Sequence, residues 1–143
     1  MSANVFFDTN VLVYLYSIDE PEKQQAALKQ IEANKNRWIS TQVLSELSNI
    51  LRKKFNLEYS NIVTVLTEIQ ESFQVVTVQP HTIKHALYLA QTYRYSYYDS
   101  LILAASLEKT CCFLYSEDMQ HQQTIEQQLT IVNPFETIEH QKS

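Results

Sequence analysis

The sequence predicts an α/β protein in which a mostly parallel sheet is covered by helices on both faces. Short apolar segments alternate along the chain with longer segments of helical periodicity. The short segments are apolar throughout rather than at every second position, which is typical of parallel strands buried on both faces. The chain has 143 residues, 45% hydrophobic and 19% charged, which fits one globular domain. We expect this domain to span residues 1–135, followed by a polar tail at 136–143.

The first half of the chain is expected to contain two strands and four helices. The run at 4–7 is short and apolar, as in a buried strand. Two acids followed by Pro21 favour a helix start, because an acidic cap and a proline suit the first turn. Ser40 and Thr41 can cap a helix whose apolar residues keep a spacing of 3.6. In order, the expected elements are strand 4–7, helix 11–17, helix 21–34, strand 38–39, helix 41–51 and helix 60–69.

The second half is expected to contain two helices and three strands. β-branched residues at 73–78 predict a strand. The segment 96–109 is apolar nearly all round, which predicts a buried helix. In order, the expected elements are strand 73–78, helix 82–93, helix 96–109, strand 111–115 and strand 130–132.

The chain contains no glycine, which excludes a P-loop and a dinucleotide-binding fingerprint. Asparagine is the next best residue for left-handed backbone positions. Asn34, Asn36 and Asn56 stand where helical patterns end, so we expect them to take the place of glycine at helix ends.

The charge and the cysteines limit the classes of function. The net charge is −5, from 16 acidic and 11 basic residues, whereas proteins that coat a phosphate backbone are usually basic. Contact with nucleic acid is therefore expected to be transient and to use local basic patches. No apolar run is long enough for a membrane span, and the N-terminus lacks the pattern of a secretion signal. Cys111 and Cys112 are adjacent and ill placed for a disulfide, so a reducing, cytoplasmic location is expected.

Four acids are candidates for a shared site. Asp8 and Asp118 follow apolar strands, and the carboxyl ends of parallel strands meet at one edge of a sheet. Glu46 and Asp99 lie in apolar helical segments. Carboxylates from separate elements are the oxygen ligands that a hard cation such as Mg²⁺ prefers. The four acids together predict such a site.

Taken singly, each acid has a structural alternative. Asp8 could simply cap a helix, and Asp99 stands three residues after Ser96, the spacing of a capping box. Glu46 alone is typical of a solvated helix, and Asp118 alone is typical of a loop.

Five stretches form a recognisable series: residues 5–14 (VFFDTNVLVY), 39–46 (ISTQVLSE), 96–105 (SYYDSLILAA), 114–121 (LYSEDMQH) and 133–135 (NPF). In this order they resemble the PIN domain family and, within it, the VapC-type toxins of bacterial toxin–antitoxin pairs. The resemblance covers residues 3–135 and implies a three-layer α/β/α sandwich and a Mg²⁺- or Mn²⁺-dependent endoribonuclease. It also implies an RNA substrate, a cognate antitoxin and a homodimer.

The resemblance implies roles for six residues. Asp8, Glu46, Asp99 and Asp118 occupy the acidic positions of the family, which hold metal and carry catalysis. Asn10 and Ser116 match polar positions that help to organise the site. The chain departs from the family at Thr110 and Gln122, where we expect glycine.

Several other features have two interpretations. Arg37 and the run at 52–54 could hold RNA phosphates or form solvated helix ends. Tyrosines at positions 93, 95, 97 and 98 could stack on bases or form a dimer contact, and for at least two of them we expect ordinary packing. His81 and His85 have the spacing of zinc ligands but no third ligand nearby.

Two alternatives to the metal nuclease fit the sequence less well. A phosphatase with a strand-end aspartate would need a second aspartate in place of Asn10. A degenerate PIN domain that only binds RNA or protein would not need all four acids.

Overall fold

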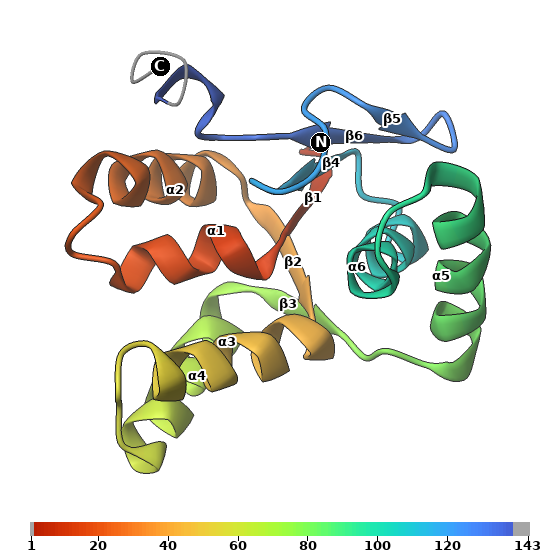
Figure 1. The fold of residues 1–143 in the computed structure, drawn as a ribbon. Helices are drawn as coiled ribbons and strands as arrows, with labels where there is room; N and C mark the ends of the chain where they lie inside the picture. Colours follow the sequence, from red (N-terminus) through yellow and green to blue (C-terminus); the bar gives the residue numbers. More distant parts are fainter. Residues whose placement is uncertain (1, 139–143) are drawn as a thin grey trace.

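The computed structural model describes residues 2–138 and contains one six-stranded sheet (Figure 1). The strands are β1 (Asn4–Phe7), β2 (Asn36–Ser40), β3 (Gln74–Val76), β4 (Phe113–Tyr115), β5 (Thr124–Ile125) and β6 (Leu129–Val132). Their order across the sheet is β3-β2-β1-β4-β6-β5. All neighbouring strands run parallel except β5 and β6, which are antiparallel. The expected mostly parallel sheet is confirmed.

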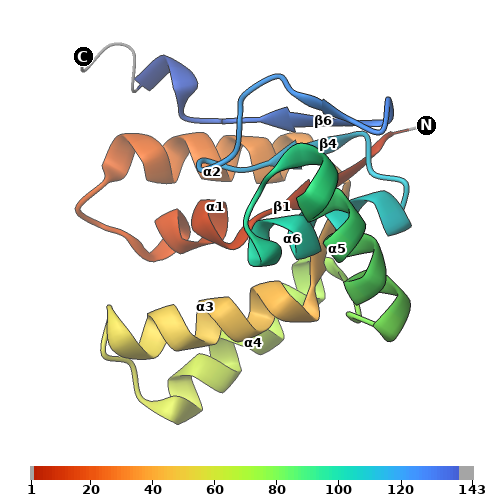
Figure 2. The ribbon, with the colours of Figure 1, turned by 45° about the vertical axis from the view of Figure 1, so that its right-hand side comes forward.

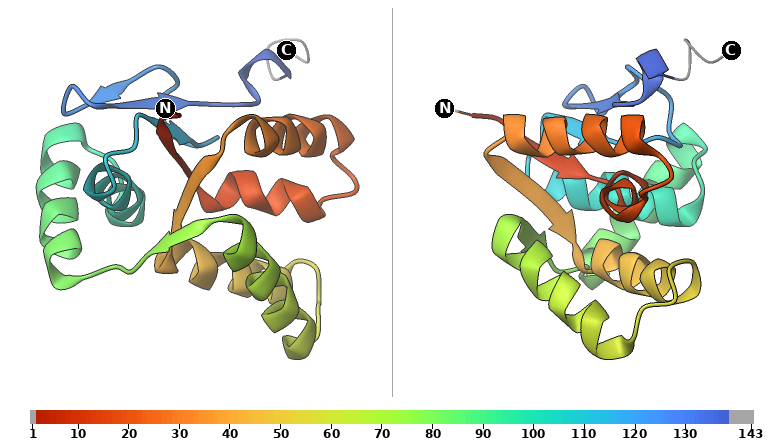
Figure 3. Two further views of the ribbon diagram at one scale, coloured as in Figure 1. Left: turned by 180° about the vertical axis from the view of Figure 1, so that it is seen from behind. Right: turned by 90° about the vertical axis from the view of Figure 1, so that its left-hand side faces the viewer.

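Helices flank the sheet. They are α1 (Thr9–Val13), the 3₁₀ turn η1 (Tyr14–Tyr16), α2 (Pro21–Ala33), α3 (Thr41–Lys53), α4 (Tyr59–Ser72), α5 (Pro80–Tyr93) and α6 (Tyr97–Glu108). Seen from opposite sides in Figures 1 and 3, α1 and α2 lie on one side of the strands and α5 and α6 on the other. This arrangement is the three-layer sandwich that the sequence implied.

The core lies between these layers. Phe6, Phe7 and Leu114 of the two central strands have no exposed surface. Helix α6 buries eight consecutive residues, from Ser100 to Leu107, which confirms that its apolar sequence marks a buried helix. Strands β1 and β4 are therefore enclosed on both faces, and only their ends reach solvent.

The helices and strands depart from the sequence expectations mainly at their ends. The helix expected at 11–17 begins earlier, at Thr9, and ends as the turn η1. Helix α5 begins at Pro80, because Gln79 and Thr82 form a reciprocal cap. Strand β5 was not expected at all, since two residues carry too little pattern to predict a strand.

Left-handed backbone positions are occupied by non-glycine residues. Asn56 has a φ of 53°, as expected for an asparagine that replaces glycine. The same expectation is wrong for Asn34, which is extended at the end of α2, and for Asn36, which lies in β2. Thr110 and Gln122, where the family resemblance led us to expect glycine, have φ values of 49° and 72°. Their left-handed backbone explains why glycine suits these two turns.

The remaining expectations concern the cysteines, the membrane and the C-terminal tail. Cys111 is buried, Cys112 is exposed, and neither forms a disulfide. Within residues 2–138, no helix is long and apolar enough to cross a bilayer. Residues 136–138 of the expected tail are helical, and the rest of that tail lies outside the described residues.

Candidate active site

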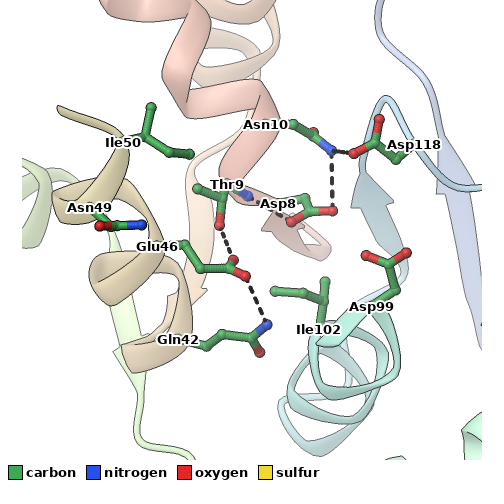
Figure 4. Close-up of a pocket in the computed structure, with 10 residues that line it drawn as sticks. All are labelled: Asp8, Thr9, Asn10, Gln42, Glu46, Asn49, Ile50, Asp99, Ile102 and Asp118. Atoms are coloured by element: carbon green, nitrogen blue, oxygen red, sulfur yellow. Dashed lines mark hydrogen bonds between the residues drawn. The ribbon is translucent and has the colours of Figure 1, made fainter. Parts of the chain in front are cut away.

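A pocket of about 350 Å³ opens at the carboxyl ends of β1 and β4 (Figure 4). All four acids that the sequence singled out line it: Asp8, Glu46, Asp99 and Asp118. Asp8 follows β1, Asp118 follows β4, Glu46 lies on α3 and Asp99 lies in the first turn of α6. Six further residues complete the lining: Thr9, Asn10, Gln42, Asn49, Ile50 and Ile102. The pocket is as large as a small ligand site.

Asp8 is the most buried of the four acids, with 5% of its surface exposed. One carboxylate oxygen, Oδ1, accepts a hydrogen bond from the backbone of Thr9 at 2.7 Å, so Asp8 does cap α1. The other, Oδ2, accepts from the Ser116 hydroxyl at 2.9 Å. Burial raises the pKa of Asp8 to about 7 against the lowering effect of these bonds, and the negative charges of Asp99 and Glu46 raise it further. The capping role and the place in the acid cluster therefore coexist.

Asn10 links the two strand ends. Its Nδ2 donates to Asp118 Oδ2 at 3.0 Å and lies 3.5 Å from Asp8 Oδ2. Its Oδ1 accepts from the backbone of Glu117 at 3.2 Å. One amide thus fixes the carboxylate that follows β1 relative to the one that follows β4.

Asp99 stands at the start of α6. The Ser96 hydroxyl caps this helix by accepting a hydrogen bond from the backbone of Asp99 at 3.2 Å. The Asp99 carboxylate lines the pocket. Its pKa is raised, first by partial burial and then by the charges of Asp118 and Glu46. The Asp99 carboxylate therefore belongs to the same electrostatic cluster as the other three.

Neutral donors hold Glu46 in the pocket. The Thr9 hydroxyl donates to its Oε1 at 2.6 Å, and Gln42 Nε2 lies 3.4 Å from its Oε2. Gln42 Nε2 also donates to the backbone oxygen of Tyr98 at 3.0 Å, which joins α3 to the start of α6. The sequence analysis missed both donors. A signal was present for Gln42, which stands one helical turn before Glu46 and so faces the same way.

Glu117, next to Asp118, points elsewhere. It accepts a hydrogen bond from the Tyr14 hydroxyl at 2.7 Å and pairs with Lys23 Nζ at 2.6 Å. The Lys23 ammonium also lies 5.1 Å from the centre of the Tyr14 ring and 5.6 Å from that of Phe135. We call Tyr14, Lys23 and Glu117 the latch.

The donor set of the pocket suits a hydrated divalent cation. Within residues 2–138, no three Asp, Glu, His or Cys side chains stand close enough to hold a metal ion together. Mg²⁺ does not need such a cage, because it binds through one or two carboxylates and keeps several waters. Four carboxylates around one open pocket supply these oxygens. His81 and His85 contact different glutamates, Glu108 and Glu126.

Comparisons with known proteins identify a matching family and similar folds. A sequence model of the PIN domain family matches residues 5–126. A comparison with curated protein sequences found no match. Among solved structures, the fold is similar to a toxin–antitoxin complex from Klebsiella pneumoniae, with a TM-score of 0.70 and 21% identity over 92% of this chain and 98% of that chain.

Two further structures share the fold. VapC20 from Mycobacterium tuberculosis, described as a toxin that cleaves the sarcin–ricin loop, has a TM-score of 0.65 and 20% identity over 80% of this chain and 90% of that chain. DNA-bound VapBC from Salmonella typhimurium has a TM-score of 0.69 and 16% identity over 92% of this chain and 98% of that chain.

Proposed function

This chain belongs to the PIN domain family, and on that premise we propose that it is an endoribonuclease that works with Mg²⁺ or Mn²⁺. One observation carries the proposal: four carboxylates from four separate elements line one pocket at the end of the parallel sheet. That is the edge at which open α/β sheets place their sites.

Each acid has a proposed role. Asp8, Asp99 and Asp118 would hold the cation, and Glu46 would orient the attacking water or bind a second cation. The chemistry supplied by a bound cation is polarisation of the scissile phosphate and a lowered pKa for a bound water. In-line attack of water on phosphorus would break the bond to O3′, which leaves as a 3′-hydroxyl after taking a proton, and would leave a 5′-phosphate on the other fragment.

The neighbouring polar residues orient the acids. Ser116 donates to Asp8 Oδ2 and thereby fixes the direction of that carboxylate. Asn10 holds Asp118. Thr9 holds Glu46. These donors are neutral, so they position the acids without cancelling the negative charge that attracts a cation.

The experiment is RNA cleavage by the purified protein, with and without a chelator. Asp99→Asn and Asp118→Asn are expected to abolish cleavage, whereas Asp19→Asn makes the same chemical change on the surface and should cleave as wild type does. Undiminished cleavage in excess chelator, by a preparation free of contaminating ribonuclease, would refute the proposal. A Mn²⁺ titration separates a nuclease from a degenerate domain, since a degenerate site would not bind the ion.

We further propose that the protein is the toxin of a VapBC-type pair, a homodimer that acts on cytoplasmic RNA and is restrained by an antitoxin. The support is the resemblance of its motifs to VapC-type toxins together with its fold. Negative potential at the pocket would favour a basic side chain from such an antitoxin. Expression of the chain should slow growth, and the product of an adjacent short reading frame should relieve this. Failure of both effects would remove the toxin role.

A further inference from the structure

One face of α3 lines the acid pocket and continues beyond it toward the C-terminal end of the helix. Gln42, Glu46, Asn49 and Lys53 are spaced four, three and four residues apart, which places them in one stripe along the helix. Gln42, Glu46 and Asn49 line the acid pocket. The opposite stripe, Val43, Leu47 and Leu51, is buried in the core. The exposed stripe is therefore free to meet a ligand longer than the pocket.

A second pocket continues from the acid pocket toward the end of α3. It has a volume of about 320 Å³ and shares Asn10, Asn49 and Ile50 with the acid pocket. Its further lining is apolar on one side, from Val13 and Tyr14, and basic on the other, from Lys53 and Lys54. Figure 2 shows the last turns of α3 below α1, and residues of these two segments line the pocket. An apolar wall opposite two ammonium groups suits a flat base joined to a phosphate.

Lys53 and Lys54 are the basic residues of this region that can contact a ligand in the second pocket. Arg37 donates to the backbone oxygens of Ile31 and Ser72 and so supports the fold. Arg52 donates to the backbone of Leu57. Lys53 and Lys54 are exposed and line the second pocket.

An aromatic pair, Tyr97 and Tyr98, directly precedes Asp99 at the start of α6. Tyr98 precedes Asp99 and its backbone oxygen is held by Gln42. Its side chain is 64% exposed, and its ring meets that of Tyr97 edge to face, with 5.2 Å between centroids. Tyr93 and Tyr95 instead use their hydroxyls for contacts with the 120–126 segment. Two of the four tyrosines are thus structural, and Tyr97 and Tyr98 are open to a ligand.

We propose that the α3 stripe, the Lys53–Lys54 pocket and Tyr98 form one track for an unpaired RNA strand. This inference rests on the proposed nuclease function. The scissile phosphate lies over the four acids, a base enters the second pocket with its phosphate at the lysines, and a base on the other side stacks on Tyr98. From Gln42 to Lys53 the helix rises about 16 Å, and a stacked strand advances about 3.4 Å per nucleotide. The track therefore holds about three to five nucleotides.

The charges favour RNA over a protein segment as the occupant. The acid pocket by itself repels phosphate, so a substrate strand needs cations close by, and the chain as a whole carries a charge of −5. Lys53 and Lys54 adjoin the pocket and supply them. A duplex would hide the base faces that Tyr98 and the apolar wall can contact.

The test measures binding of a fluorescein-labelled 12-nucleotide RNA of random sequence, unpaired and annealed to its complement. It uses the Asp8→Asn background, so that cleavage does not interfere. Lys53→Ala/Lys54→Ala should weaken binding of the unpaired RNA about tenfold or more and reduce the salt slope by about 1.4, because each phosphate contact on a single strand contributes about 0.7. Tyr98→Ala should weaken binding at least about fivefold with an unchanged salt slope, and Tyr98→Phe should bind normally.

Matched controls exist for both ends of the track. Lys29→Ala/Lys35→Ala removes two exposed lysines elsewhere, and Tyr88→Ala removes a tyrosine that is 61% exposed on α5. Both should bind as the background does. Thermal stabilisation by Mn²⁺, measured without RNA in otherwise wild-type protein, should be unchanged in Tyr98→Ala, which separates stacking from damage to Asp99.

The outcomes distinguish the track from the proposed function. If wild type cleaves RNA with Mg²⁺ but the track variants keep the affinity and KM of their controls, the track is wrong and the nuclease stands. Equal affinity for paired RNA also overturns the track. Loss of antitoxin binding with RNA binding intact would assign the surface to a protein. A wild type that neither binds nor cleaves RNA removes both proposals.

Discussion

Glu117 and Asp118 are neighbours in sequence, yet the structure treats their charges in opposite ways. Glu117 pairs with Lys23 inside the latch and accepts a hydrogen bond from the Tyr14 hydroxyl. Asp118 joins Asp8, Glu46 and Asp99 around a pocket where, within residues 2–138, no Lys or Arg comes within 4.0 Å of a carboxylate. The fold can thus supply a cation one residue away from a cluster that it leaves negative. The difference is in keeping with our proposal that the pocket takes a cation from outside the chain.

The largest expected effect comes from a substitution in the acid cluster. Asp8→Asn keeps the shape and the capping bond but removes a charge and a hard metal ligand. We expect RNA cleavage to fall at least ~100-fold, because metal-assisted attack is the proposed source of rate. In chelator the variant should be more stable than wild type by on the order of 1 kcal/mol, since repulsion within the cluster is relieved.

Paired melting curves with and without Mn²⁺ test this prediction. The variant should lose most of the rise in Tm that Mn²⁺ gives wild type, because stabilisation by a ligand depends on binding to the native state. A variant that melts well below wild type in chelator would show that Asp8 serves mainly as a cap. The site would then have to be rebuilt around the other three acids.

The next largest effect is expected from a substitution in the latch. Lys23→Met leaves Glu117 without a cation that lies 2.6 Å away, in a pair whose side chains are only 16% and 17% exposed. We expect a loss of about 2 kcal/mol in the free energy of unfolding, because the variant removes an ion pair that is largely shielded from solvent. Glu117→Gln in the same chain should restore part of it.

Urea unfolding of the two variants checks the latch, with Lys29→Met on the exposed face of α2 as the control. The acid cluster should respond in the opposite direction, because removing one of its charges should stabilise the metal-free protein. If Lys23→Met unfolds at the same urea concentration as Lys29→Met, the latch contributes nothing measurable to stability. The proposed contrast between the latch and the acid cluster would then be wrong.

A smaller effect appears in the pH dependence of the metal-free protein. The pKa of Asp8 is raised to about 7 in the fold, so between pH ~4 and 7 the native state binds a proton that the unfolded state has released. Stability from this group is therefore lost as pH rises through that window. In chelator, Tm should fall from pH 5 to pH 8 by a few degrees, on the order of 1 kcal/mol. Asp8→Asn should flatten the profile, and an equally steep one would contradict this origin.

The smallest effect lies outside both regions and tests the backbone alone. Thr110 is a β-branched residue with a φ of 49°. Thr110→Gly should stabilise the protein by about 0.5–1 kcal/mol, because relief of the left-handed strain outweighs the added freedom of the unfolded chain. The Mn²⁺-dependent rise in Tm should stay unchanged. Destabilisation would indicate that the Thr110 side chain stabilises the turn more than its backbone strains it.

The sequence predicted those parts of the fold and site that local pattern encodes. Apolar runs predicted β1 and β4. Because the residues that follow a strand can be identified from the sequence, Asp8 and Asp118 could be placed at one edge of the sheet. Helical spacing placed Glu46 on α3. Strand β5 has only two residues and no pattern of its own.

The contacts that orient the acids could not be predicted from the local sequence pattern. The bond from Thr9 to Glu46 spans 37 residues, and the pair of Lys23 and Glu117 spans 94. Such contacts arise when packing brings distant segments together, and neither partner carries a signal for the other. For the same reason Asn36 was misplaced at a turn, since its role in β2 depends on pairing with Asn4.

The hydrogen bonds at the sheet centre bear on how this site would open. The Asp8 amide donates to the Tyr115 oxygen at 2.9 Å, and the Ser116 amide donates to the Val132 oxygen at 3.0 Å, so both are bound into the central ladder of β1, β4 and β6. Amides of this kind exchange with solvent only when a large cooperative unit opens. The Asp8 side of the acid pocket is therefore tied to opening of the central sheet, whereas Glu46 and Asp99 lie on α3 and α6, outside that ladder.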